Sequence, residues 1–126
     1  MGGSILGCVK KIPNIFPSPG FSSDAAISST AKWKATMLLG TPTMFVDVLG
    51  NPALRSGEFD VSSLSHAILG GSPVTPTLAK AAKEELGTQI AVAYGMTETT
   101  GASFVTPFGI EDEIALNTVG YAVTLT

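Results

Sequence analysis

Residues 66–98 read HAILGGSPVTPTLAKAAKEELGTQIAVAYGMTE, and this stretch decides the fold class. It opens and closes with short apolar runs, HAILG (66–70) and QIAVAYG (89–95). Such continuous runs are typical of strands buried on both faces, as in a parallel sheet. Between them, the Thr-Pro pair at 75–76 predicts a capped helix start and Gly87 predicts the helix end. The stretch therefore predicts a β-α-β unit.

The same pattern continues toward the N-terminus. The apolar runs IPNIF (12–16) and TMLLG (36–40) each predict a buried strand, and helices are predicted over 23–33 and 41–50. Residues 51–65 are interpreted as a surface connection with a short turn of helix. The order of elements predicts an α/β fold: a parallel sheet with right-handed crossovers and flanking helices on both sides.

Composition limits the size of the folding unit. The 126 residues suffice for one domain at most, and only 13% of them are charged, against about 25% in a typical soluble domain. So few charges predict either helices on both faces of the sheet or a surface that lies against protein absent from this sequence. The second alternative predicts that residues 1–126 are part of one larger domain and contain no complete domain boundary.

Several classes of partner and site are disfavoured. The net charge is −3 and no basic cluster exceeds Lys10-Lys11, which argues against a nucleic-acid partner. The single cysteine excludes an internal disulfide and a cysteine-rich zinc site, and is compatible with an intracellular location. The apolar stretch 35–46 is interrupted at 40–42, so no membrane span is expected, and no Arg-rich targeting peptide is visible.

The loops after the predicted strands are the expected ligand site, because ligands bind outside the carboxyl ends of parallel strands. GGSPVTP (70–76) combines glycines, which let the backbone approach a ligand, with a helix start at Thr75 that favours negative charge. The alternative interpretation of this loop is an ordinary tight turn between strand and helix.

YGMTETTG (94–101) is the more specific of these loops. Tyr94 offers a ring for stacking, Thr97 and Thr99 offer hydroxyls to phosphate oxygens, and Glu98 offers a carboxylate to a hard cation such as Mg²⁺. The alternative is a capped turn in which Thr97 and Glu98 satisfy the end of a following helix.

The charge around this loop is unusual for a phosphate site, because residues 84–126 contain no Lys or Arg. A triphosphate carries about four negative charges, and one Mg²⁺ with helix termini of about half a charge each does not neutralise it. Further cationic groups are therefore expected from elsewhere. His66 is expected at the opposite edge of the sheet, as a structural or surface residue.

Three motifs together resemble a known family. YGMTE (94–98), GGSPV (70–74) and GTPTMF (40–45) resemble, in their order and spacing, the adenylate-forming (AMP-binding) acyl-CoA synthetase family. LLGTPTMFVDVL (38–49) is most similar to the acyl-CoA synthetase family member 2 branch, which acts on medium-chain fatty acids in mitochondria. The resemblance covers about residues 2–120.

The resemblance implies a reaction and a set of site residues. Such enzymes convert a fatty acid and ATP to acyl-AMP and pyrophosphate, and then transfer the acyl group to coenzyme A. Thr97 would contact phosphate and Glu98 would bind Mg²⁺, so that both would be catalytic. The helix beginning at Thr41 would line the acyl tunnel together with Gly70, Gly95 and Met96. The implied adenosine-phosphate site consists of Gly71, Ser72, Pro73, Tyr94, Gly95, Met96 and Thr97.

The sequence also departs from the family. The glycine-rich phosphate loop, the ribose-binding aspartate and the C-terminal domain with its catalytic lysine are absent, and Tyr121 stands where the family has arginine after Val-Gly. These departures predict an internal fragment that is inactive alone and whose partners are the missing domains of the same enzyme. The alternatives are a non-catalytic adenine-nucleotide-binding or interaction module, and a flavodoxin-like domain that would bind flavin.

Overall fold

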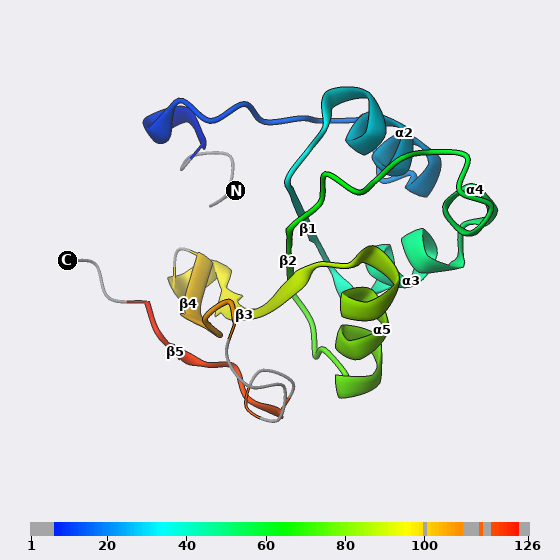
Figure 1. Ribbon diagram of the computed structural model, residues 1–126. Helices are drawn as coiled ribbons and strands as arrows, with labels where there is room; N and C mark the ends of the chain where they lie inside the picture. Colours follow the sequence, from blue (N-terminus) through cyan, green and yellow to red (C-terminus); the bar gives the residue numbers. More distant parts are fainter. Residues whose placement is uncertain (1–6, 100, 110–113, 115–116, 124–126) are drawn as a thin grey trace.

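The computed structural model describes residues 7–99, 101–109, 114 and 117–123 (Figure 1). The elements, in chain order, are α2 (Ser23–Trp33), β1 (Met37–Gly40), α3 (Pro42–Gly50), α4 (Pro52–Arg55), β2 (His66–Gly70), α5 (Pro76–Leu86), β3 (Gln89–Met96), the 3₁₀ turn η1 (Thr97–Thr99), β4 (Gly101–Val105) and β5 (Tyr121–Ala122). The α/β class and the three strands predicted over 36–40, 66–70 and 89–95 are confirmed.

The strands form one mixed sheet in the order β1-β2-β3-β4-β5. β1, β2 and β3 are parallel, with Met37 opposite His66 and His66 opposite Gln89. β3 and β4 are antiparallel because the chain reverses at η1 instead of crossing over through a helix, and β5 pairs antiparallel with β4. The parallel part of the sheet was predicted from the sequence, whereas the β3–β4 hairpin was not.

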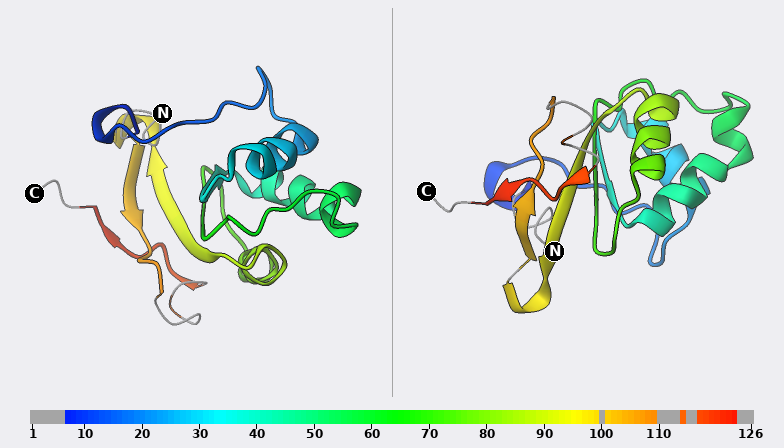
Figure 2. Two further views of the ribbon diagram at one scale, coloured as in Figure 1. Left: turned by 45° about the horizontal axis from the view of Figure 1, so that its top comes forward. Right: turned by 90° about the horizontal axis from the view of Figure 1, so that it is seen from below.

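The helices α2, α3 and α5 lie on one side of the sheet (Figures 1 and 2), so the prediction of helices on both sides is wrong. β1, β2 and β3 follow each other in sequence order, and right-handed crossovers taken in one direction place the crossover helices α3 and α5 on the same face. On the opposite face, Met37 is 42% exposed and Leu39 is 51% exposed. Among the described residues, no helix has the length and apolar character required to cross a membrane.

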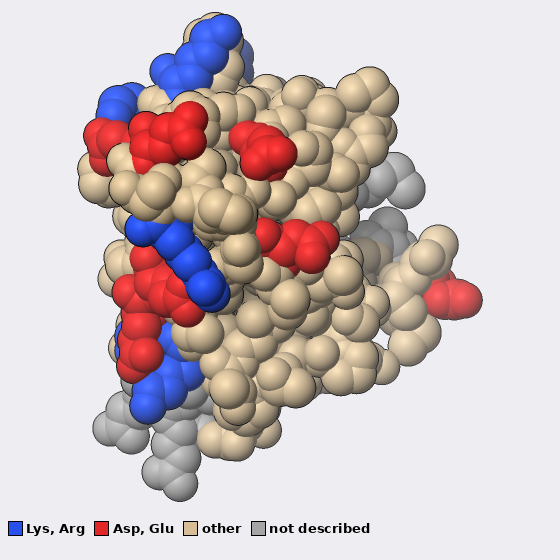
Figure 3. Space-filling view, turned by 90° about the vertical axis from the view of Figure 1, so that its right-hand side faces the viewer, with Lys and Arg blue, Asp and Glu red and all other residues tan. Residues whose placement is uncertain are grey.

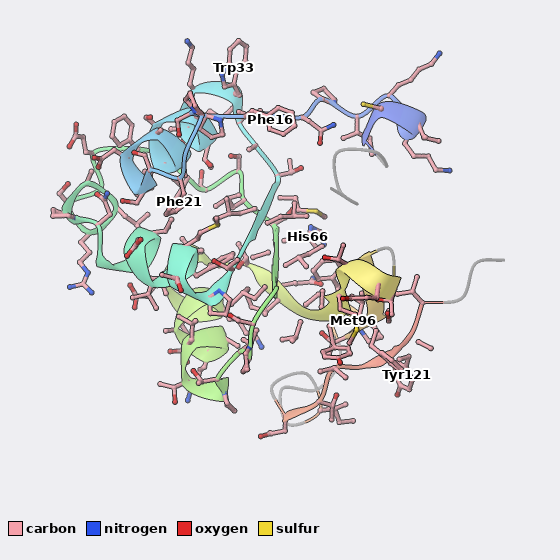
Figure 4. All side chains as sticks on the ribbon, turned by 180° about the vertical axis from the view of Figure 1, so that it is seen from behind. Phe16, Phe21, Trp33, His66, Met96 and Tyr121 are labelled. Carbon is pink, nitrogen blue, oxygen red and sulfur yellow. The ribbon has the colours of Figure 1, made fainter. Side chains whose placement is uncertain are left out.

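The predicted strand over 12–16 is also wrong, because this segment has no regular secondary structure. Pro13 and Pro17 have no backbone N–H, which makes the segment a poor partner for a neighbouring strand. Ile12 and Phe16 are exposed, and Figure 4 shows Phe16 near the end of α2, away from the sheet.

The hydrophobic core lies between the sheet and its helical layer. Phe45 of α3 and Leu69 of β2 are its largest fully buried apolar side chains, and they pack with small residues that let the helices approach closely. The remaining buried members of this cluster are Ala26, Ile27, Val48, Leu49, Ala67, Ala79, Ala82, Leu86 and Ile90.

The helix boundaries follow from local side-chain chemistry. The Thr41 hydroxyl accepts a hydrogen bond from the N–H of Met44, and Thr75 accepts one from the N–H of Leu78. Each threonine is followed by a proline at the first helical position, where a missing N–H costs nothing. Gly87 ends α5 in the left-handed conformation, as its position in the sequence predicts.

A polar contact fixes the connection between α2 and α4. The side-chain amide of Asn51, which is buried, donates to Ser23 Oγ at 3.0 Å and to Asp24 Oδ1 at 2.7 Å. At the other end of α2, Lys34 pairs with Asp60 at 2.6 Å. Lys34 and the neighbouring Ser62 hold the pKa of Asp60 well below its usual range.

Candidate functional site

The site is built at the edge where the parallel strands end. β1 and β2 end at Gly40 and Gly70, and Gly71 then turns the chain away from the sheet with a φ of +89°. Residues with a Cβ rarely adopt this backbone conformation, so glycine is favoured there. A Cβ at Gly71 would lie 3.4 Å from the Thr41 methyl group, which shows that the loop after β2 lies beside the start of α3.

A pocket of about 560 Å³ opens at this edge. Three segments form it: the loop after β2 with the start of α5, the end of β3, and residues 117–119, which return from the C-terminal part of the chain. The lining residues are Gly71, Ser72, Pro73, Val74, Pro76, Val92, Ala93, Tyr94, Gly95, Asn117, Thr118 and Val119. The structure thus brings together five of the predicted site residues, which come from two separate loops.

Tyr94 lies at the rim of the pocket and is 45% exposed. It is paired across the hairpin with Phe104, and the centroids of the two rings are 6.2 Å apart at an interplanar angle of 53°. The neighbouring aromatic ring orients Tyr94 without covering it, so one side of the ring remains available to a planar ligand.

Gly95 permits the close approach of β3 and β4. The pairing of the two strands is irregular between Tyr94 and Gly95, and a Cβ at Gly95 would collide with the backbone oxygen of Gly101. Glycine at this position therefore sets the geometry that holds Tyr94 against the pocket.

Met96, Thr97 and Glu98 lie beyond the pocket and do not line it. Figure 4 shows Met96 at the end of β3 that is far from the helices. Thr97 and Glu98 are exposed in η1, and their side chains have no hydrogen-bond partner among the described residues. The turn is held instead by Thr99, whose hydroxyl accepts from the N–H of Met96 at 3.2 Å and lies 3.0 Å from its carbonyl oxygen. The alternative in which Thr97 and Glu98 cap the turn is therefore wrong, because the capping hydrogen bonds come from Thr99.

Of the residues expected along an acyl tunnel, only Gly95 lines the pocket. Gly70 is the last residue of β2, and a Cβ there would lie 2.6 Å from the carbonyl oxygen of Ala93 on β3. Neither Gly70 nor Thr41 lines the pocket.

The described residues that line the pocket carry no charged side chain. Within the described part of the chain, no group of three or more His, Cys, Asp or Glu side chains is arranged to hold a metal ion. Figure 3 shows the helical side of the molecule, where Lys and Arg lie among Asp and Glu and form no patch of one sign. The site is therefore suited to a neutral, planar group and not, by itself, to a polyphosphate.

His66 lies at the opposite edge of the sheet, as predicted, because it is the first residue of β2. Its Nδ1 atom is 2.8 Å from Ser65 Oγ, and its ring meets the edge of Phe108 at a centroid distance of 4.5 Å. These contacts give His66 a structural environment outside the pocket.

The sequence over residues 7–126 matches the family described as AMP-binding enzyme. The chain belongs to the AMP-binding enzyme family. This assignment excludes the flavodoxin-like alternative.

Relatives within the AMP-binding family include acyl-CoA ligases. The chain is 34% identical over 105 residues to the mitochondrial medium-chain acyl-CoA ligase ACSF2 of Danio rerio, covering 82% of this chain and 17% of the relative. It is 36% identical over 107 residues to an acyl-CoA ligase of Penicillium expansum, covering 84% of this chain and 22% of that protein. The resemblance to the acyl-CoA synthetases and their medium-chain branch is thus confirmed, and the chain spans about a fifth of the length of these relatives.

Solved structures show the same fold. An anthranilate CoA ligase in complex with anthranoyl-AMP superposes with a TM-score of 0.74 at 22% identity, covering 86% of this chain and 20% of that one. An ATP-bound RpMatB-BxBclM chimera superposes with a TM-score of 0.69 at 26% identity, covering 83% and 19%. The fold of this chain is therefore one found within larger adenylate-forming proteins.

The third wall of the pocket was missed by sequence reasoning. Asn117, Thr118 and Val119 follow β4 by more than ten residues and carry no local signal of strand, helix or tight turn. The Val-Gly pair at 119–120, which resembles the family's Val-Gly-Arg, is the sequence signal that could have pointed to this segment.

Proposed function

We propose that this chain forms the adenosine-binding part of an acyl-CoA ligase that activates a medium-chain fatty acid with ATP and transfers it to coenzyme A. The observation that carries the proposal is the uncharged pocket of about 560 Å³ that gathers the loop after β2 and the end of β3. Membership of the AMP-binding enzyme family supports the proposed reaction, and the pocket is the proposed binding site of the adenine base.

In this proposal Gly71, Ser72 and Pro73 flank the adenine and Tyr94 stacks on it. The pocket supports this arrangement, because a purine needs flat apolar walls and room for its edge. Tyr94 is held from one side by Phe104, which lowers the cost of ordering its ring on binding.

The phosphate end of the ligand is proposed to lie further along the chain. Thr97 would contact the α-phosphate and Glu98 would bind Mg²⁺ through its carboxylate, an oxygen ligand of the kind that Mg²⁺ prefers. The acyl group would lie near Gly70, Met96 and the start of α3 at Thr41. The side chains of Thr97 and Glu98 are exposed in η1 and are available for this role.

Calorimetric titration of the full chain with a sulfamoyl analogue of octanoyl-AMP tests the adenosine site. We expect saturable binding, and we expect the variant Tyr94→Ala to bind about 5- to 150-fold more weakly, because base–aromatic stacking contributes about 1–3 kcal/mol. Tyr121→Ala is the matched control, since Tyr121 is 63% exposed and lies outside the pocket. Equal losses in the two variants, or no binding by the wild type, would contradict the proposal.

We further propose that the chain alone does not turn over. The pocket wall has no cationic side chain and residues 84–126 have no Lys or Arg, so the charge of ATP and pyrophosphate stays uncompensated. A coupled pyrophosphate-release assay with octanoate, ATP, Mg²⁺ and coenzyme A should stay at background. Release that depends on octanoate would overturn this point.

The uncharged pocket also favours a second candidate, a non-catalytic adenine-nucleotide-binding module. The two candidates differ in the role of the acyl group. A ligase fragment should bind the octanoyl analogue more tightly than AMP, whereas a nucleotide-binding module should bind both with similar affinity.

The setting of the function is proposed from the relatives. The medium-chain acyl-CoA ligases that the chain matches are named as mitochondrial, so we propose a role in mitochondrial lipid metabolism. We also propose that residues 1–126 act as part of one adenylation domain, with the rest of that domain as its partner.

A further inference from the structure

Asn117 is one of the residues that line the pocket, together with Tyr94 and two hydroxyl residues, Ser72 and Thr118. Its side chain is a primary amide. Asparagine and glutamine are the side chains whose planar amide places a donor beside an acceptor.

The other polar side chains of the wall are less suited to reading a base edge. Thr118 is engaged within its own segment: its hydroxyl donates to the carbonyl oxygen of Ile114 at 2.9 Å and accepts from the N–H of Gly120 at 3.2 Å. Tyr94 offers its ring face, and Ser72 has a single hydroxyl that rotates freely. Among the described lining residues, Asn117 is the one with a planar side-chain amide, so it is the side chain able to pair with two neighbouring atoms of a planar ligand.

We propose that Asn117 is the base-reading residue of this pocket and pairs with the 6-amino edge of adenine; this inference rests on the proposed adenosine site. Adenine presents the N6 amino donor beside the N7 acceptor, and an asparagine amide matches both atoms at once. A primary amide has two donor hydrogens and two acceptor positions, so it can hold a contact within the chain and still bind a base. Tyr94 would thus provide affinity through stacking, and Asn117 would provide selectivity.

The test removes the 6-amino group from the ligand and the amide group from residue 117 in separate experiments. Calorimetry of the full chain compares AMP with purine riboside 5′-monophosphate, which lacks the 6-amino group, for the wild type and for Asn117→Leu. We expect the wild type to prefer AMP by about 10-fold, and we expect the preference to disappear in Asn117→Leu because the variant cannot form the paired hydrogen bonds. Asn117→Ala repeats the comparison with a smaller side chain, and circular dichroism checks the fold of each variant.

Asn14→Ala is the matched control, because Asn14 is exposed on the N-terminal segment and lies outside the pocket. It should keep the preference of the wild type. An AMP preference that persists in both Asn117 variants overturns the inference but leaves the adenosine site standing, provided that Tyr94→Ala still loses affinity. No binding of AMP by the wild type overturns the inference and the proposed site together.

Discussion

Replacing Phe45 by alanine should lower the free energy of unfolding by about 3–5 kcal/mol, the usual cost of removing a buried aromatic side chain and leaving a cavity. Phe45 is 1% exposed, on the face of α3 that packs against β1 and β2. Its ring fills the space left by Gly40, where a Cβ would lie 3.2 Å from Phe45 Cε2. Because a domain has a total stability of about 5–15 kcal/mol, we expect a much lower urea midpoint by circular dichroism.

Phe16→Ala is the control for this measurement. Phe16 is 74% exposed on the N-terminal segment, so its removal should change the free energy of unfolding by no more than about 0.5 kcal/mol. If Phe45→Ala and Phe16→Ala had the same midpoint, the core between the sheet and the helical layer would not be the stabilising unit of this chain.

The second large effect is expected for Gly95→Ala, which should disrupt the β3–β4 hairpin. The added Cβ would collide with the backbone oxygen of Gly101 and lie 2.6 Å from its carbonyl carbon. Because both contacts are with backbone, no side-chain rotation relieves them, and we expect a loss of about 2–3 kcal/mol. Amide hydrogen exchange in residues 101–105 should become faster, and the adenosine analogue should bind more weakly because Tyr94 is displaced.

Gly50→Ala separates this effect from the general cost of a glycine substitution. Gly50 ends α3, and a Cβ there meets nothing within 4 Å. This variant should be neutral or stabilised by up to about 1 kcal/mol, because alanine restricts the unfolded chain.

Slow amide hydrogen exchange across β4 in Gly95→Ala would contradict the proposed packing of the hairpin.

The candidate site was predictable where its residues follow directly from predictable strands. Gly71, Ser72, Pro73, Tyr94 and Gly95 share a pocket because the carboxyl ends of β2 and β3 meet at one edge of the sheet. The same reasoning could not place Thr97 and Glu98, because the hairpin extends β3 past the sheet edge before the chain turns. Asn117 returns to the pocket from a distant part of the sequence, so no local pattern points to it.

The sequence by itself determined the parallel β1-β2-β3 unit and its helices, because Thr-Pro caps, glycine ends and continuous apolar runs act within a few residues of each other. Tertiary structure decided two other features: the exposure of Met37 and Leu39 on the face of the sheet opposite the helices, and the third wall of the pocket. An apolar run becomes a strand only if another strand is free to pair with it, and a loop lines a site only if the chain returns there. Both conditions depend on residues far away in the sequence.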